Sequence, residues 1–233
     1  MKEIINILNL TTYRYEKKYV ISVLNENKFF FHLNKHPFLF EKSYDDRYVN
    51  NIYFDTPSMN SYWDNVIGLS KRIKVRIRWY GDARGYIQCP ILELKIRNNA
   101  LGSKVSYRLG EILIDSNLTI KSIQEQFMKL DAPLPIKEFL LSLRMTLMNR
   151  YSRKYFVTKD QNFRLTYDSE LQFTAINNYG NSFNNKINSE KRRVFEVKYD
   201  QSLIGKAPEI SNYFPFRMTK SSKYVFGIDK LKS

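Results

Sequence analysis

Apolar and polar residues alternate over several short stretches of the chain, the pattern typical of β-strands that bury one face. This alternation, together with short apolar runs, predicts strands over residues 11–20, 50–55, 73–80, 91–96, 104–109, 144–158, 163–168, 172–176 and 193–199. Helical spacing predicts helices over residues 22–33, 120–130, 135–143, 208–213 and 221–228. The buried side of the first helix is expected to contain Val23, Leu24, Phe30 and Phe31.

No repeat and no long linker divides these elements. Residues 177–190 are rich in Asn and polar, which predicts an exposed loop. The sequence therefore predicts one strand-rich α+β domain over residues 1–233.

Several predicted strands carry charged side chains on one face and apolar side chains on the other. Lys74, Arg76 and Arg78 alternate with apolar residues in the stretch 73–79. The same alternation continues in other strands at Glu16, Lys18, Glu93, Lys95, Arg97, Arg164, Asp168, Glu196 and Lys198. An antiparallel sheet with one face in water accounts for any one of these strands. The alternative for the whole set is a barrel with a charged interior and an apolar outer wall covered by helices.

The composition is strongly basic. The 233 residues include 38 Lys and Arg against 23 Asp and Glu, a formal net charge of +15. This charge predicts a polyanionic partner, which composition leaves open among nucleic acid, an acidic membrane and phosphorylated small molecules.

Other residue counts exclude several chemistries. The single cysteine, Cys89, rules out an intramolecular disulfide and a thiolate zinc site, and we expect it to be a small filler or a loop residue. His32 and His36 are the only histidines, which leaves little room for histidine-based catalysis, and both are expected at the surface. No apolar run is long enough to span a membrane and no signal peptide is evident, so we expect a cytoplasmic protein.

Confined cations need counter-charges. Two like charges about 5 Å apart repel by about 3 kcal/mol at an effective dielectric constant near 20. A chain of phosphates supplies matching negative charge, and arginine binds phosphate oxygens in pairs. The few carboxylates among the cations then suit Mg²⁺ or Mn²⁺, which bind oxygen ligands and bridge phosphates.

A set of motifs in fixed order resembles one family. These are YEKKY at 15–19, NNIYFDTP at 50–57, KVRIRWYG at 74–81, LELK at 92–95, YSRKYF at 151–156, RLTYD at 164–168, FEVKY at 195–199 and KSSKY at 220–224. The chain resembles the VTC domain, the polyphosphate polymerase module of the vacuolar transporter chaperone complex and its prokaryotic relatives. That family belongs to the triphosphate tunnel metalloenzyme superfamily, so the resemblance implies an antiparallel β-barrel tunnel with a charged interior and helices packed outside.

The resemblance also implies an activity and its residues. The enzymes of the family transfer the γ-phosphoryl group of ATP onto a growing inorganic polyphosphate chain, with Mn²⁺ or Mg²⁺ as cofactor. The residues implied as catalytic are Arg76, Arg78, Lys95, Arg153 and Arg164. Those implied to bind substrate are Lys18, Lys104, Lys198, Lys220 and Lys223. Glu196 is implied as the metal ligand, with Glu16 and Glu93 as second-ranked candidates.

Two other functions stay open. One is a tripolyphosphatase or other triphosphate hydrolase of the same superfamily, although Arg14 stands where those relatives carry the first Glu of an ExExK motif. The other is a non-catalytic module that binds polyphosphate or another polyanion. Nucleic acid is not expected, since a narrow interior would favour bare polyphosphate over a chain of bases.

The remaining predictions concern flanking domains and residues with structural roles. We expect neither the N-terminal SPX domain nor the C-terminal membrane helices of eukaryotic subunits, and a separate membrane-protein partner stays open. Asp55 is expected to be a turn or cap residue, and Asp168 either a metal neighbour or part of a structural salt bridge. Trp63, Trp79 and the tyrosines are expected in the core of the outer wall.

Overall fold

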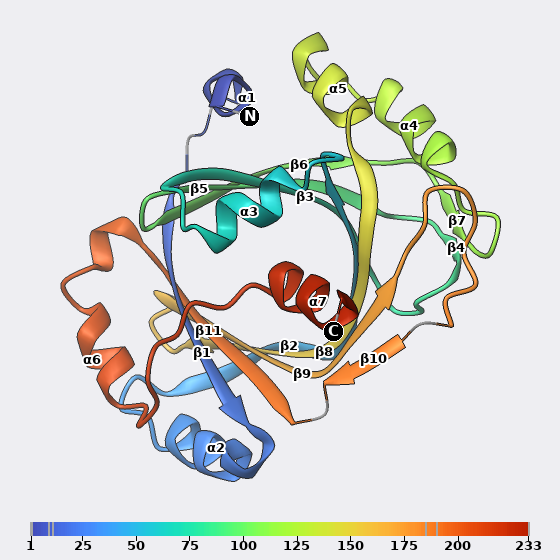
Figure 1. The fold of residues 1–233 in the computed structure, drawn as a ribbon. Coiled ribbons are helices and arrows are strands. Elements are labelled where there is room, and N and C mark those ends of the chain that lie inside the picture. The colour runs from blue at the N-terminus through green and yellow to red at the C-terminus, as the bar shows by residue number, and fades with distance from the viewer. Residues whose placement is uncertain (1, 9, 11, 185, 190, 233) are drawn as a thin grey trace.

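A ring of antiparallel strands forms the body of the molecule (Figure 1). The computed structural model describes the chain apart from residues 1, 9, 11, 185, 190 and 233. The strands of the ring are β1 (Arg14–Ser22), β2 (Phe40–Asp55), β3 (Lys71–Tyr80), β5 (Ile91–Asn98), β6 (Leu101–Arg108), β8 (Arg144–Thr158), β9 (Phe163–Ala175) and β11 (Arg192–Asp200). They follow the order β9-β11-β1-β6-β5-β3-β2-β8, and pairing between β8 and β9 closes the ring.

Shorter elements surround this barrel. The strand β10 (Lys186–Ser189) pairs with β9, and β4 (Gly85–Ile87) pairs with β7 (Ile112–Ile114) in a small separate sheet. The helices are α1 (Lys2–Ile7), α2 (Glu26–Asn34), α3 (Asn60–Val66), α4 (Ile120–Met128), α5 (Leu134–Leu141), α6 (Ala207–Asn212) and α7 (Lys223–Lys232). Among the described residues, no helix combines the length and the hydropathy needed to cross a lipid bilayer.

Two apolar clusters cover the outer wall of the barrel. One joins the outward faces of β2, β3 and β5 to α1, α4 and α5, and it contains Ile73, Val75, Ile77 and Trp79. The other joins β1, β9 and β11 to α2 and α6, and it contains Phe195, Val197 and Tyr199. The apolar positions of the alternating strands are therefore buried, which confirms the predicted outer wall and turns their charged partners inward.

A third apolar cluster lies inside one end of the barrel. Tyr224 and Ile228 of α7 pack there against Tyr53, Leu147 and Phe173 from β2, β8 and β9. In Figure 1, α7 is the red helix within the ring of strands. The last helix of the chain therefore fills this end of the barrel.

The structure differs from the predicted elements in several places, and the short elements α1, α3, β4 and β7 were not predicted. The strand β2 begins ten residues earlier than the predicted start at residue 50. The sequence pattern missed its first half because that half is polar, exposed and bulged and so lacks apolar alternation. The two strands predicted over 163–168 and 172–176 are one strand, β9, which is irregular near Glu170. The predicted loop 177–190 contains β10, a short strand whose polar sequence gives no periodic signal.

Several side-chain predictions were wrong. In α2 the buried residues are Phe29 and Leu33, one turn apart, whereas Leu24 precedes the helix and is 90% exposed. Trp63 is also largely exposed, as are Tyr44, Tyr86 and Tyr179, which were expected in the core. Trp79 is buried as predicted.

His36 is a further case, because it is fully buried rather than at the surface. Its Nε2 donates a hydrogen bond to the carbonyl oxygen of Ile210 at 3.2 Å, and its Nδ1 accepts one from the Phe38 amide at 3.2 Å. Burial lowers the pKa of His36, which suits a neutral ring that links α2 to α6.

Candidate active site in the barrel interior

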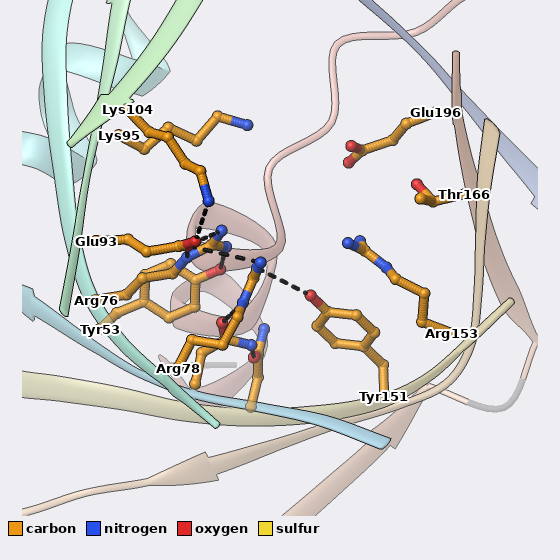
Figure 2. Close-up of polar contacts among 12 residues, drawn as sticks. Tyr53, Arg76, Arg78, Glu93, Lys95, Lys104, Tyr151, Arg153, Thr166 and Glu196 are labelled. Carbon is orange, nitrogen blue, oxygen red and sulfur yellow. Dashed lines mark hydrogen bonds and ion pairs between the residues drawn. The ribbon is translucent and has the colours of Figure 1, made fainter. Parts of the chain in front are cut away.

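Charged side chains from separate strands converge inside the barrel (Figure 2). One wall consists of β3, β5 and β6 and presents Arg76, Arg78, Glu93, Lys95 and Lys104. The facing wall consists of β8, β9 and β11 and presents Tyr151, Arg153, Thr166 and Glu196. Of the residues predicted as catalytic, Arg76, Arg78, Lys95 and Arg153 are therefore brought together.

Glu93 is the centre of the first wall. Its Oε2 accepts hydrogen bonds from Arg76 Nε at 2.8 Å and Arg76 Nη2 at 2.6 Å, and its Oε1 accepts one from Lys104 Nζ at 2.8 Å. Arg78 Nη1 lies 3.6 Å from Oε2. Burial would raise the pKa of Glu93, but Arg76, Arg78 and Lys104 outweigh it and hold this pKa well below its ordinary value.

Glu16 and Glu196 lie on the neighbouring strands β1 and β11. Glu16 accepts two hydrogen bonds from Lys95 Nζ, at 3.0 and 2.8 Å. The two oxygens of Glu196 lie 3.2 Å from Lys18 Nζ and 3.2 Å from Lys198 Nζ. Burial raises the pKa of Glu16, and Glu196 raises it further, but Lys95 and Lys18 outweigh both. The two carboxylates are therefore close enough to influence each other.

Asp168 joins two strands of the barrel to α7. It forms a two-point pair with Arg153 of β8, with Nε–Oδ1 and Nη2–Oδ2 distances of 2.6 and 2.7 Å. Lys223 at the start of α7 donates to Oδ2 at 2.5 Å. Of the two roles left open for Asp168, the structure supports the salt bridge.

Two predicted substrate or catalytic residues stand apart from this network. Arg164 and Lys220 are both exposed, and neither makes an ion pair within the described part of the chain. Arg164 lies opposite Lys198 in the pairing of β9 with β11, and Lys220 follows a segment paired with β1 next to Lys18. Both therefore lie beside the network with their charges unneutralised.

Sequence reasoning did not select three interior residues that the structure brings into the site. Lys74 Nζ donates to Ser222 Oγ at 2.8 Å, and burial together with neighbouring lysines and arginines lowers the pKa of Lys74 well below its ordinary value. The hydroxyls of Tyr53 and Tyr151 accept hydrogen bonds at 3.4 Å from Arg76 and Arg78. The strand alternation did mark Lys74. Tyr53 and Tyr151 lie within the motifs at 50–57 and 151–156, but neither motif assigned them to the interior, because their contacts with arginines depend on the strand register.

The pKa values of Lys95 and Tyr151 are both shifted from their ordinary values toward pH 7. Burial lowers the pKa of Lys95 to about 7, although Glu16 acts in the opposite direction. Burial would raise the pKa of Tyr151, but Arg153, Arg78 and Lys223 outweigh it and lower this pKa to about 8. The Lys95 shift therefore reflects burial first, whereas the Tyr151 shift reflects the surrounding cations.

The acidic residues fit a divalent cation only with help from a substrate. Within the described ranges, no group of three or more His, Cys, Asp or Glu side chains could hold a metal ion. Glu196 and the nearby Glu16 offer two carboxylates, and Mg²⁺-like ions bind through one or two carboxylates plus phosphate oxygens and water. The donor set therefore fits a metal that arrives with a phosphate chain.

The closed antiparallel barrel with its charged interior is a triphosphate tunnel fold. A family model described as the VTC domain matches residues 13–232, and the chain therefore belongs to the VTC domain family. The enzymes of the triphosphate tunnel superfamily, to which this family belongs, generally use divalent metal ions. No curated protein matches the chain at a significant level.

Solved structures resemble the chain at low sequence identity. A provisionally assigned adenylate cyclase from Bacillus halodurans has a TM-score of 0.51 and 13% identity, over 91% of this chain and 96% of that chain. Another from Vibrio parahaemolyticus has a TM-score of 0.49 and 12% identity, over 91% and 97% of the two chains. A protein from Pyrococcus horikoshii OT3 has a TM-score of 0.49 and 11% identity, over 93% and 99%.

Proposed function

We propose that this protein is a polyphosphate polymerase that transfers the γ-phosphoryl group of ATP onto a growing inorganic polyphosphate chain inside the barrel. The observation that supports the proposal is the convergence of cations from separate strands on one interior space (Figure 2). In this proposal residues 1–233 act as one tunnel domain, and the chain's partners are ATP and polyphosphate.

The chemistry needs little covalent help from the protein. A terminal phosphate oxygen of the acceptor chain attacks the γ-phosphorus of ATP, a new P–O bond forms, the bond from the γ-phosphorus to the β–γ bridging oxygen breaks, and ADP leaves. The nucleophile is already anionic, so no general base is required. Positioning and charge stabilisation then supply most of the rate enhancement, which suits a site without histidine.

The arginines carry the transferred group in this proposal. Arg76 and Arg78 of β3 face Arg153 of β8 across the interior. Arginine presents paired donors that match phosphate oxygens, so these three side chains stabilise the charge on the γ-phosphoryl group as it moves. Lys95 acts with them, and Arg164 is assigned the same role from its place beside Lys198.

The lysines hold the remainder of the phosphate chain. Lys18 and Lys198 flank Glu196, Lys104 lies against Glu93, and Lys223 lies against Asp168. Each is now bound to a carboxylate and can exchange that partner for a phosphate oxygen. Lys220, which is exposed, is assigned to the same chain of phosphates.

Glu196 holds the divalent cation, Mn²⁺ or Mg²⁺, in this proposal, with Glu16 as a second carboxylate. When bound, such an ion neutralises phosphate oxygens and acts as a Lewis acid on them. The chain's own contribution is to keep the carboxylate deprotonated. Burial would raise the pKa of Glu196, but Lys18 and Lys198 hold it well below its ordinary value.

Arg14 favours polymerisation over hydrolysis. Its Nε lies 3.7 Å from Glu16 Oε1, so this position adds a positive charge beside the carboxylate. A carboxylate in the same place would instead favour a second metal ion and an activated water. The hydrolase and the non-catalytic polyanion binder become outcomes of the test below.

The deciding experiment incubates the purified protein with ATP and Mn²⁺ and separates long-chain polyphosphate from orthophosphate. We expect polymer and ADP in matching amounts. Orthophosphate without polymer would identify a hydrolase, and tight binding of tripolyphosphate without turnover would identify a binding module. Either result would overturn the proposal.

A separate variant tests the assignment of Glu196 as the metal ligand. Glu196→Gln keeps the shape of the side chain and removes its charge, so metal-dependent turnover should fall at least about 100-fold while tripolyphosphate still binds. Glu209→Gln on α6, an exposed carboxylate, is the matched control and should keep full activity. Unchanged turnover in Glu196→Gln would refute the role of Glu196.

A further inference from the structure

An arginine enclosed by three tyrosine rings lies at the opposite end of the barrel from α7. The Arg47 guanidinium carbon lies 5.2 Å from the ring centre of Tyr44, 4.7 Å from that of Tyr80 and 4.9 Å from that of Tyr155. The rings of Tyr44 and Tyr155 also meet edge to face at 5.5 Å. We refer to Tyr44, Arg47, Tyr80 and Tyr155 as the aromatic mouth.

Strand register places the aromatic mouth next to the phosphate site. Arg47 pairs with Arg153 across β2 and β8, and Tyr44 pairs with Tyr155 two steps further along. Tyr80 follows Arg76 and Arg78 on the same face of β3.

Stacked cations and rings connect the mouth to the interior. The Arg153 guanidinium lies 5.1 Å from the Tyr151 ring and 5.9 Å from the Tyr155 ring. Tyr155 in turn stacks on Arg47. Arginines and tyrosines therefore alternate from Tyr151, deep in the barrel, out to the exposed rings.

The contacts of Arg47 leave its charge available. Among the described residues, no carboxylate forms an ion pair with Arg47, and its buried Nε has no hydrogen-bond partner. The nearby Asp46 is already bound by Lys42 at 3.0 Å and Lys154 at 2.9 Å. An arginine kept without a counter-ion points to an anionic or electron-rich ligand.

The rings are open to that ligand. Tyr44 is 61% exposed and Tyr80 is 44% exposed, although both lie beside a buried network. At the other end of the barrel, α7 packs against the interior and Lys223 and Ser222 bind Asp168 and Lys74. A bulky group attached to a bound triphosphate therefore has room at the aromatic mouth and not at the α7 end.

We propose that the aromatic mouth binds the base of a nucleoside triphosphate. Exposed tyrosine rings stack on a base of any identity, and Arg47 adds a cation–π contact and a donor for the ribose-side phosphate. This inference rests on the proposed function, since it assumes that the triphosphate occupies the interior. It adds that nucleotides are held by base as well as phosphates, in an orientation that directs the γ-phosphate toward Arg76, Arg78 and Arg153.

The test compares two ligands with the same phosphates and different ends. Calorimetry measures the affinities of β,γ-imido ATP and of tripolyphosphate, with Mg²⁺, for the wild-type chain and for Tyr44→Ala/Tyr80→Ala. We expect the double variant to bind the ATP analogue at least about fivefold more weakly, from the size of base–aromatic stacking, and tripolyphosphate as tightly as the wild type. Unchanged tripolyphosphate binding also establishes that the variant is folded.

Two controls sharpen this result. Tyr44→Phe/Tyr80→Phe keeps the rings and should keep the affinity for the ATP analogue. Tyr179→Ala removes a ring that is 83% exposed elsewhere on the molecule and should change neither ligand. Equal losses for both ligands, or no loss for either, would overturn the base-binding role.

The outcome is separable from that of the proposed function. If the chain makes no polyphosphate but Tyr44→Ala/Tyr80→Ala weakens only the ATP analogue, the polymerase proposal fails and the base site stands. If polymer forms and the double variant binds the ATP analogue normally, the base site fails and the polymerase stands. If the wild type binds neither ligand, both fail.

Discussion

The Tyr224 hydroxyl of α7 donates a hydrogen bond of 2.7 Å to the buried carboxylate of Asp55 at the end of β2. Asp55 also accepts from the backbone amides of Thr56, Ser61 and Tyr62 at 2.8 to 2.9 Å, which confirms its expected role as a turn and cap residue. The same carboxylate thus fixes the start of α3 and the position of α7 inside the barrel.

Removing this hydroxyl should loosen α7 without disturbing the cap. Tyr224→Phe deletes one hydrogen bond to a buried charged acceptor, which is worth about 1.5–3 kcal/mol. We expect the free energy of unfolding, measured in urea, to fall by this amount. Tyr86→Phe removes a hydroxyl from a tyrosine that is 70% exposed and should leave stability unchanged. Equal stability of the two variants would contradict this account of α7.

The packing of α7 gives a second prediction. A Cβ atom at Gly227 would lie 2.5 Å from Phe173 Cδ1 and 2.6 Å from Leu147 Cδ2, side chains that face the interior from β9 and β8. Gly227→Ala therefore overpacks this end and should cost about 1–3 kcal/mol in thermal or urea unfolding, despite the better helix propensity of alanine. At Gly205 the same atom would meet nothing within 4 Å, so Gly205→Ala is the matched control and should be tolerated.

Strand periodicity carried most of what the sequence could predict. It separated the outward residues Val75 and Ile77 from the inward Arg76 and Arg78, because a period of two residues assigns faces without any knowledge of partners. It could not assign partners. Each Glu of the inward set precedes a Lys by two residues, yet Glu93 pairs with Arg76 and Lys104 of adjacent strands, which only the register determines.

The position of α7 inside the barrel could not be predicted from the sequence either. An apolar stripe predicts that a helix packs on something, but it does not distinguish the outer face of a barrel from the inner face. Tyr53 and Tyr151 were assigned to the outer wall for the same reason, since an aromatic residue suits either side. Their contacts with Arg76 and Arg78 depend on the register of β2 with its neighbours β3 and β8.

Glu93 should stabilise the fold while the interior is empty and matter less once phosphate is bound, because phosphate can replace its charge beside Arg76 and Lys104. Glu93→Gln leaves Arg76, whose side chain is 14% exposed, without its counter-charge, and breaking such a buried pair costs about 3–5 kcal/mol. We expect a lower melting temperature in phosphate-free buffer. Added tripolyphosphate should raise it by more than in the wild type, because a tighter ligand stabilises more.

The exposed carboxylate of Glu41 on β2 supplies the comparison for Glu93. Glu41→Gln should melt like the wild type with and without tripolyphosphate. An equal ligand-induced rise in Glu93→Gln and the wild type would mean that the cations around Glu93 do not bind phosphate.

Tyr151 should report the charge of the interior directly. Because surrounding cations lower its pKa to about 8, one tyrosine of the folded protein should form tyrosinate near pH 8, well before ordinary tyrosines. The ultraviolet absorbance of tyrosinate measures this step, and Tyr151→Phe should remove it. Bound tripolyphosphate brings negative charge beside the ring, which disfavours the phenolate and should shift the step to higher pH. A step that stays at the same pH with ligand present would place the phosphates away from Arg78 and Arg153, and so away from the proposed site of transfer.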